Sequence, residues 1–261
     1  MCYNKTTMKR IILILTLFLL LINTVANATT NTTSKEITAT SSDGYTMKGY
    51  FEYPKVKDKN EFPTVVLLHS LGYSSEWWCS LPQDLLNQGY AVLRIDLRGH
   101  GKSVYNSKLM RTSWSSMTNN AFAKYPDDVI KVIEQVKNEN TKKIFFKNWA
   151  IVGSDIGAST AVLVADKIAY KPKTIVMLSP VVETKGLYIP VKLANLDKVD
   201  IFSISGTNDN TGLKSQEYLK KFSQATFATY TSEARSNGML MLKNDNALSR
   251  IITSWIKEYL K

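Results

Sequence analysis

A sharp bend between a predicted strand and a predicted helix carries the residues best placed for chemistry. Residues 147–160 read KNWAIVGSDIGAST, in which an apolar run typical of a strand precedes small residues that favour a helix. Gly153 and Gly157 flank the bend and let backbone and helix approach closely. This spacing places Asp155 at the tip, the nucleophile's position in strand–turn–helix elbows, and predicts that Ser154 points away from the site.

The remaining elements predict the sheet that must position this bend. Residues 36–54 carry two polar-alternating runs around Ser-Ser-Asp-Gly, which indicates a hairpin. Strands are expected within 62–70, 90–99, 149–153, 173–179, 199–206 and 227–231, the first two of them buried. Helices are expected within 80–90, 122–139, 156–170, 213–222 and 247–260. This order predicts an α/β fold with a mostly parallel, twisted sheet of about eight strands and helices on both faces. Ligands of such sheets bind beyond the carboxyl ends of the strands.

The loops after these strands resemble, in order, those of the α/β-hydrolase family. LLHSLGYSSEWW resembles its loop after the third strand, IDLRGHGKS the loop after the fourth, and GSDIGAS the nucleophile elbow. SGTNDN resembles the loop of the acid and ARSNGMLML the loop of the histidine. MLSPVVETKGLYIP is similar to a segment of dienelactone-hydrolase-like and serine-peptidase-like bacterial members. The short stretch between MLSP and VDIFS leaves room only for a small lid. The resemblance spans nearly the whole chain after residue 28 and implies an α/β-hydrolase fold.

The resemblance also assigns a role to each position of the site. It implies that Asp155 stands at the nucleophile position, Asp209 at the acid position and Asn237 at the histidine position. By position, the backbone amides of Leu71 and Ile156 are the expected oxyanion hole, which can persist when side chains are lost. Only the acid therefore matches the usual set of nucleophile, acid and histidine.

The catalytic histidine has no counterpart in this sequence. The chain contains 2 histidines, His69 and His100, and both lie in the predicted loops after the third and fourth strands. Asn237 cannot replace the base, because an amide does not take up a proton near neutral pH. Without a base a serine is not activated and an acyl intermediate is not cleared.

Three other interpretations of the site remain open at this stage. Related haloalkane dehalogenases and epoxide hydrolases use an elbow aspartate as nucleophile, but they need the missing histidine, and Tyr188 is the one tyrosine in the predicted lid. The amide of Asn237 has two hydrogens, so it could bridge Asp155 and Asp209 in a non-reactive network. The same three side chains could offer oxygens to Ca²⁺ or Mg²⁺, although three ligands from separate loops are few.

The amino terminus predicts a secretory signal peptide at residues 1–28. Lys9 and Arg10 precede the apolar run 11–22, and Ala26-Asn27-Ala28 is typical of a cleavage site, with Met1 or Met8 as the start. The alternative is an uncleaved amino-terminal anchor. Cleavage after Ala28 would leave 29–261 as a single α/β-hydrolase domain, secreted or periplasmic, without a stable membrane span.

Composition narrows the classes of partner. The 261 residues are 44% hydrophobic and 21% charged, which suits one domain with a full core. Cleavage would remove three positive charges and no acid, lowering the net charge from +11 to +8, and we expect dispersed surface lysines. No nucleic-acid motif or zinc-ligand spacing occurs, and we expect no cofactor and no metal. Cys79 is expected to be a buried small side chain, and Trp77 and Trp78 to be core or pocket residues.

Three hypotheses of function follow. The first and preferred one is an exported, catalytically degenerate member, a pseudoenzyme, that acts by binding a small molecule or an envelope protein. The second is an active hydrolase of a small ester or amide, like a carboxylesterase or peptidase, with a non-standard site. The third is a structural partner in an envelope assembly. The sequence identifies neither the ligand nor the oligomeric state.

Overall fold

The computed structural model describes residues 31–57, 61–139 and 144–260. The predicted signal peptide lies outside the described residues, so its cleavage and the export of the chain stay predictions. Residues 31–261 group into one compact unit. Within the described part of the chain, no helix combines the length and apolar character needed to cross a bilayer.

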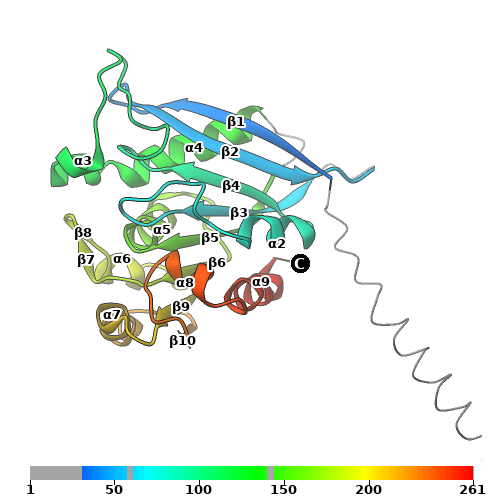
Figure 1. Cartoon of the computed structure of the whole chain (residues 1–261), viewed down its shortest axis with the longest axis vertical. Coiled ribbons are helices and arrows are strands. Elements are labelled where there is room, and N and C mark those ends of the chain that lie inside the picture. The colour runs from blue at the N-terminus through cyan, green and yellow to red at the C-terminus, as the bar shows by residue number, and fades with distance from the viewer. Residues whose placement is uncertain (1–30, 58–60, 140–143, 261) are drawn as a thin grey trace, which may run out of the picture. The chain divides into compact units, whose positions relative to one another are not determined.

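The main sheet confirms the predicted α/β architecture. It has 8 strands in the order β1-β2-β4-β3-β5-β6-β9-β10 (Figure 1). Their bounds are β1 Thr32–Thr40, β2 Thr46–Pro54, β3 Phe62–Leu68, β4 Ala91–Asp96, β5 Ile144–Ser154, β6 Thr174–Leu178, β9 Asp200–Gly206 and β10 Phe227–Ser232. The β1–β2 and β2–β4 pairs are antiparallel, and the pairs from β4 to β10 are parallel. The elbow after β5 therefore lies near the middle of the sheet, with the loops after β3, β6 and β9 at the same edge.

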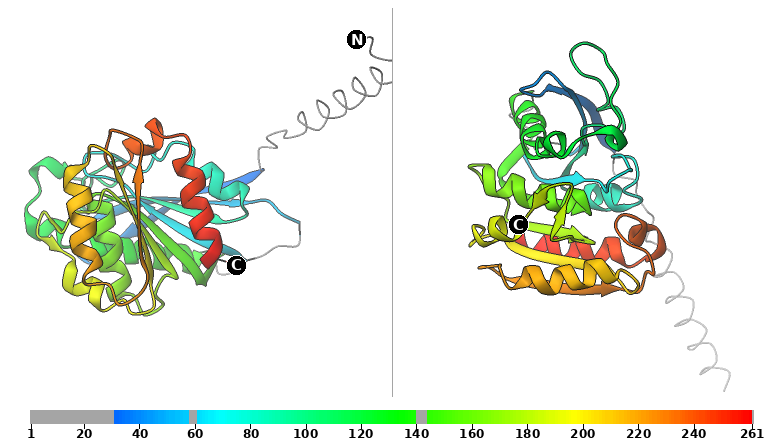
Figure 2. Two further views of the ribbon diagram at one scale, coloured as in Figure 1. Left: turned by 90° about the horizontal axis from the view of Figure 1, so that it is seen from below. Right: turned by 90° about the vertical axis from the view of Figure 1, so that its left-hand side faces the viewer.

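Helices cover both faces of this sheet (Figure 2). Their bounds are α2 Leu81–Asn87, α3 Asn119–Phe122, α4 Tyr125–Glu139, α5 Ile156–Lys167, α6 Pro190–Ala194, α7 Asn210–Lys220, α8 Leu240–Asn244 and α9 Leu248–Tyr259, with a 3₁₀ turn at Trp114–Ser116. Apolar side chains of α4, α5 and α7 pack on one face, and those of α2, α8 and α9 on the other. Successive strand residues face opposite cores, since Val66 packs with the first group and Leu67 with the second.

The helix predicted within 122–139 is present as α4, which begins at Tyr125, after the short helix α3 ends at Phe122. Pro126 explains the start of α4, because proline lacks an N–H and is tolerated only in the first turn of a helix. Val129, Ile133 and Val136 form a buried stripe on α4.

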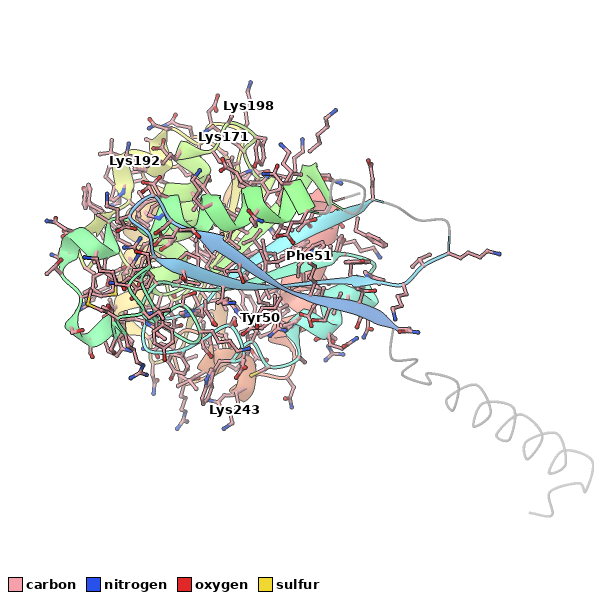
Figure 3. All side chains as sticks on the ribbon, turned by 90° about the horizontal axis from the view of Figure 1, so that it is seen from above. Tyr50, Phe51, Lys171, Lys192, Lys198 and Lys243 are labelled. Carbon is pink, nitrogen blue, oxygen red and sulfur yellow. The ribbon has the colours of Figure 1, made fainter. Side chains whose placement is uncertain are left out.

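The short lid and the surface lysines also follow the predictions. Between β6 and β9 the chain forms only β7 Glu183–Thr184, β8 Leu187–Tyr188 and α6. Lys171, Lys192 and Lys198 project on one side of the molecule and Lys243 on the other (Figure 3). The positive charge is thus spread over several elements.

Candidate functional site

The elbow has the strained geometry that its glycines predict. Asp155 joins β5 to α5 with φ 52° and ψ −117°. A Cβ on Gly153 would lie 2.3 Å from the Gly157 carbonyl oxygen, and a Cβ on Gly157 would lie 2.0 Å from the Leu68 carbonyl oxygen. Both contacts are shorter than atoms tolerate, so both positions require glycine, and Asp155 is held at the tip.

The carboxylate of Asp155 occupies the place predicted for an oxyanion. Its Oδ2 accepts a hydrogen bond from the backbone amide of Leu71 at 3.1 Å. Burial raises the pKa of Asp155 above its usual value, backbone hydrogen bonds from Leu71 and Ile156 oppose this shift, and the charge of Asp209 adds to it. The two amides expected to bind an external anion thus serve a side chain of the protein itself.

This pKa shift predicts a pH-dependent effect of Asp155→Asn on stability. An acid whose pKa is raised by folding supports the native state at low pH, and that support is lost as pH rises through the raised pKa. Asparagine keeps an oxygen acceptor for Leu71 without a buried charge. We expect the variant to unfold at a higher temperature than the natural protein above neutral pH, with an advantage that shrinks as the solution is acidified. Thermal unfolding across this pH range, beside Asp197→Asn at an exposed position, would measure it; a constant difference would contradict the expectation.

The acid and histidine positions lie at the same site but do not form the bridge considered from the sequence. Asp209 precedes α7, and its Oδ1 accepts a hydrogen bond from the Gly212 amide at 2.9 Å. Its Oδ2 is buried and has no hydrogen-bond partner among the described residues. The side chain of Asn237 is exposed. Among the described residues, neither the partner of Asp155 nor that of Asp209 is Asn237, so its amide does not link the two carboxylates.

A layer of serines lies beside the elbow and fixes the Asn237 loop. The Gly238 amide donates to Ser179 Oγ at 2.6 Å, and Ser70 Oγ lies 2.7 Å from Ser154 Oγ. Ser154 is fully buried. Its hydroxyl is held against Ser70, and Asp155 stands at the tip of the elbow.

Neither histidine is free to act as a base. His69 Nε2 accepts from the Leu97 amide at 3.0 Å, and its Nδ1 lies 2.8 Å from the Ser70 carbonyl oxygen. His100 Nε2 accepts from the Gly72 amide at 3.0 Å, and its Nδ1 lies 3.1 Å from the Arg98 carbonyl oxygen. Burial, with the nearby His100, lowers the pKa of His69 to about 3. Both rings are thus neutral supports of the loops after β3 and β4.

Two charged side chains brace the loops after β3 and β4. Asp96 accepts hydrogen bonds from the amides of Ser75 at 2.8 Å and Lys102 at 2.9 Å. The Arg98 guanidinium forms ion pairs with Asp128 at 2.8 Å and Asp43 at 2.6 Å. The loop that carries Leu71 is therefore held in place by contacts within the protein, such as the one between Asp96 and Ser75.

A cavity of about 380 Å³ unites the predicted positions. It is lined by Ser70, Leu71, Tyr73, Asp155, Ser179, Val181, Asp209, Thr211, Asn237 and Gly238. Sequence reasoning placed Leu71, Asp155, Asp209 and Asn237 there. It missed Ser70 and Ser179, although both directly follow strand ends, the positions where ligands of such sheets bind. In the described ranges, no group of three or more His, Cys, Asp or Glu side chains could hold a metal ion.

The expectation for the cysteine in the loop after β3 is wrong, whereas those for the neighbouring tryptophans agree with the structure. Cys79 is exposed with φ 51°, so its prediction as a buried residue was wrong: the left-handed turn before α2 directs it to the surface. Trp78 is a core residue, whereas Trp77 is half exposed. Trp114 stacks on His100 at 5.8 Å and, with Trp77, lines a separate cavity of about 260 Å³.

Comparison with known proteins gives one family and many structural neighbours. The sequence profile of the family described as serine aminopeptidase, S33, matches residues 59–210. This range includes the elbow and Asp209 and ends before Asn237. No curated protein sequence matches the chain significantly.

The structural neighbours are distant in sequence. An esterase from Pyrococcus furiosus is similar with a TM-score of 0.65 and 17% identity, over 88% of this chain and 92% of the other. A putative dienelactone hydrolase from Klebsiella pneumoniae is similar with a TM-score of 0.67 and 16% identity, over 88% of this chain and 100% of the other. A dienelactone hydrolase from Anabaena variabilis has a TM-score of 0.65 and 13% identity, over 88% of this chain and 99% of the other. These likenesses establish the α/β-hydrolase fold.

Proposed function

This chain belongs to the serine aminopeptidase S33 family, and we propose that it is a pseudoenzyme of that family that binds a small molecule in the cavity at the elbow. The observation that carries the proposal is the hydrogen bond from the Leu71 amide to Asp155 Oδ2 at 3.1 Å. A carbonyl oxygen of a substrate would need that amide as its transition state forms. Here the amide already has a partner, and that partner adds negative charge where an oxyanion would develop.

The positions of the candidate bases support the same conclusion. A serine route lacks its nucleophile, because Ser154 is fully buried and bonded to Ser70. An aspartyl-ester route through Asp155 would need a base to activate water for the second step. Both histidines have their ring nitrogens bonded to backbone groups, and Asn237 cannot take up a proton.

An active hydrolase of a small ester or amide is the second candidate. Two observations favour it: the family is described as that of a serine aminopeptidase, and Asp209 still stands at the position of the catalytic acid. It requires that Asp155 turn away from Leu71 and that a base enter from elsewhere. We place either activity outside the cytoplasm, secreted or periplasmic, on the strength of the predicted signal peptide.

The test is hydrolysis of p-nitrophenyl acetate and butyrate by the chain from Thr29 onward, beside Asp155→Ala. We expect both proteins to hydrolyse these esters no faster than buffer alone, because no side chain activates a nucleophile or the water that would hydrolyse an ester intermediate. An active esterase of the same fold would serve as positive control. Hydrolysis that is present in the natural protein and lost in Asp155→Ala would overturn the proposal and establish the second candidate.

A further inference from the structure

A narrow loop between β4 and α3 presents two apolar side chains to solvent. Residues 104–112 leave the body of the molecule and return as a hairpin, which projects beyond the sheet in Figures 1 and 2. Leu109 and Met110 lie at its tip and are 81% and 55% exposed. Leu109 is the most exposed of the large apolar side chains in the described part of the chain.

Hydrogen bonds hold this tip in a defined conformation. Asn106 Oδ1 accepts from the amides of Lys108 at 3.0 Å and Met110 at 2.9 Å. The Asn106 carbonyl accepts from the Leu109 amide at 2.9 Å, and the Asn106 amide donates to the Met110 carbonyl at 3.1 Å. Leu109 has φ 58°, a conformation that leucine rarely adopts. The backbone of the tip is thus held in one conformation, in which both side chains stay largely exposed.

The charged residues of the chain segment that carries the tip all have one sign. From Gly99 to Lys124 the sequence contains Lys102, Lys108, Arg111 and Lys124, and no aspartate or glutamate. Lys108 and Arg111 flank the two apolar residues, and neither forms an ion pair with any residue that the structure describes. Tyr105, bridged to Arg111 across the loop, is 44% exposed behind the tip.

We propose that this hairpin docks on an anionic lipid bilayer, with Leu109 and Met110 inserted between the headgroups. Lys108 and Arg111 would contact lipid phosphates, and Tyr105 would lie at the interface, where amphipathic rings are favoured. Two side chains are too few for a protein interface, which buries about 800 Å² per partner. A tip with basic and apolar side chains and no acidic residue instead matches an anionic lipid bilayer, whose headgroups are negatively charged and whose interior is apolar. The proposal does not depend on the chemistry of the elbow.

Sedimentation with lipid vesicles tests the docking. The chain from Thr29 is suitable because the compact unit begins at Asn31. We expect it to bind vesicles of equal parts phosphatidylglycerol and phosphatidylcholine and not vesicles of phosphatidylcholine alone. Lys108→Gln/Arg111→Gln should weaken binding at least about tenfold, since each cation near an anionic surface strengthens binding about fivefold. Leu109→Ser/Met110→Ser should weaken it at least about tenfold as well, through lost burial of apolar groups. Val191→Ser, which changes an apolar side chain 59% exposed on α6, should have no effect.

A fluorescent probe distinguishes insertion from simple charge attraction. In a Cys79→Ser background, an environment-sensitive dye on Leu109→Cys should brighten and shift to the blue with the anionic vesicles. The same dye on Val191→Cys should not respond. Absence of binding would overturn the proposal and favour a protein partner for the tip. Binding that survives Leu109→Ser/Met110→Ser, or a dye that stays in water, would overturn insertion.

Discussion

Asp155→Ser combined with Asn237→His is expected to create measurable ester hydrolysis in a protein that we propose to be a pseudoenzyme. The first change removes the carboxylate that binds the Leu71 amide and puts a hydroxyl at the elbow tip. The second puts an imidazole on the loop that lines the same cavity as Asp155 and the retained Asp209. A general base contributes a factor of about 10² to 10⁴, so we expect p-nitrophenyl acetate hydrolysis about 10³-fold faster than with either single variant.

The two single variants and one triple variant test whether the activity depends on the serine, the histidine and Asp209 together. Asp155→Ser alone lacks a general base, and Asn237→His alone keeps a carboxylate in the oxyanion position. Both single variants should therefore hydrolyse p-nitrophenyl acetate no faster than buffer alone. Adding Asp209→Asn to the active pair should reduce the rate, because the acid orients the imidazole and stabilises its charge. If the pair were well folded and inactive, the elbow and the Asn237 loop would not be a substituted catalytic site of the usual geometry.

Arg98→Met is expected to destabilise the fold by about 3–5 kcal/mol, because it leaves the buried Asp128 without its partner. The side chains of Arg98 and Asp128 are 6% and 2% exposed, and their two groups share hydrogen bonds of 2.8 Å. Asp43, the second partner, is 43% exposed and stays hydrated when the arginine is lost. The measurement is urea unfolding near neutral pH. Lys131→Met, which breaks an exposed pair with Glu134, is the matched control and should cost less than about 1 kcal/mol.

A pH series and a double variant separate the buried charge from lost packing. Burial raises the pKa of Asp128 to about 6 even though Arg98 opposes the shift. Without Arg98 that pKa should rise further, so protonation relieves the defect and the loss of stability should be smaller in mild acid than above neutral pH. Arg98→Met/Asp128→Leu should recover much of the stability, because a buried ion pair is often replaceable by apolar side chains. An equal loss at every pH, unrelieved in the double variant, would assign the effect to packing.

The described fold was largely predictable because its signals are local. The short continuous apolar runs at β3, β4 and β6 favour strands buried on both faces, and the apolar stripe on α4 favours a helix packed on a sheet. The Ser-Ser-Asp-Gly turn and the spacing of Gly153 and Gly157 are equally local. The exact start of α4 at Tyr125 agrees with Pro126, which is tolerated only in the first turn of a helix.

The features of the candidate site that depend on local sequence were predictable, and those that depend on distant contacts were not. From sequence alone came the elbow, the position of Asp155 at its tip, and the absence of a histidine at residue 237. Only the tertiary structure decided what those residues touch: Asp155 meets Leu71 across 84 positions of sequence, and His69 and His100 bond to backbone groups 28 positions away. Burial of Asp209 Oδ2, exposure of Asn237 and Cys79, and the outward tip at Leu109 likewise depend on which loops pack together. The physical reason is that periodicity and turn chemistry act over a few residues, whereas hydrogen bonds and burial at a site are set by loops that the sheet brings together from distant parts of the chain.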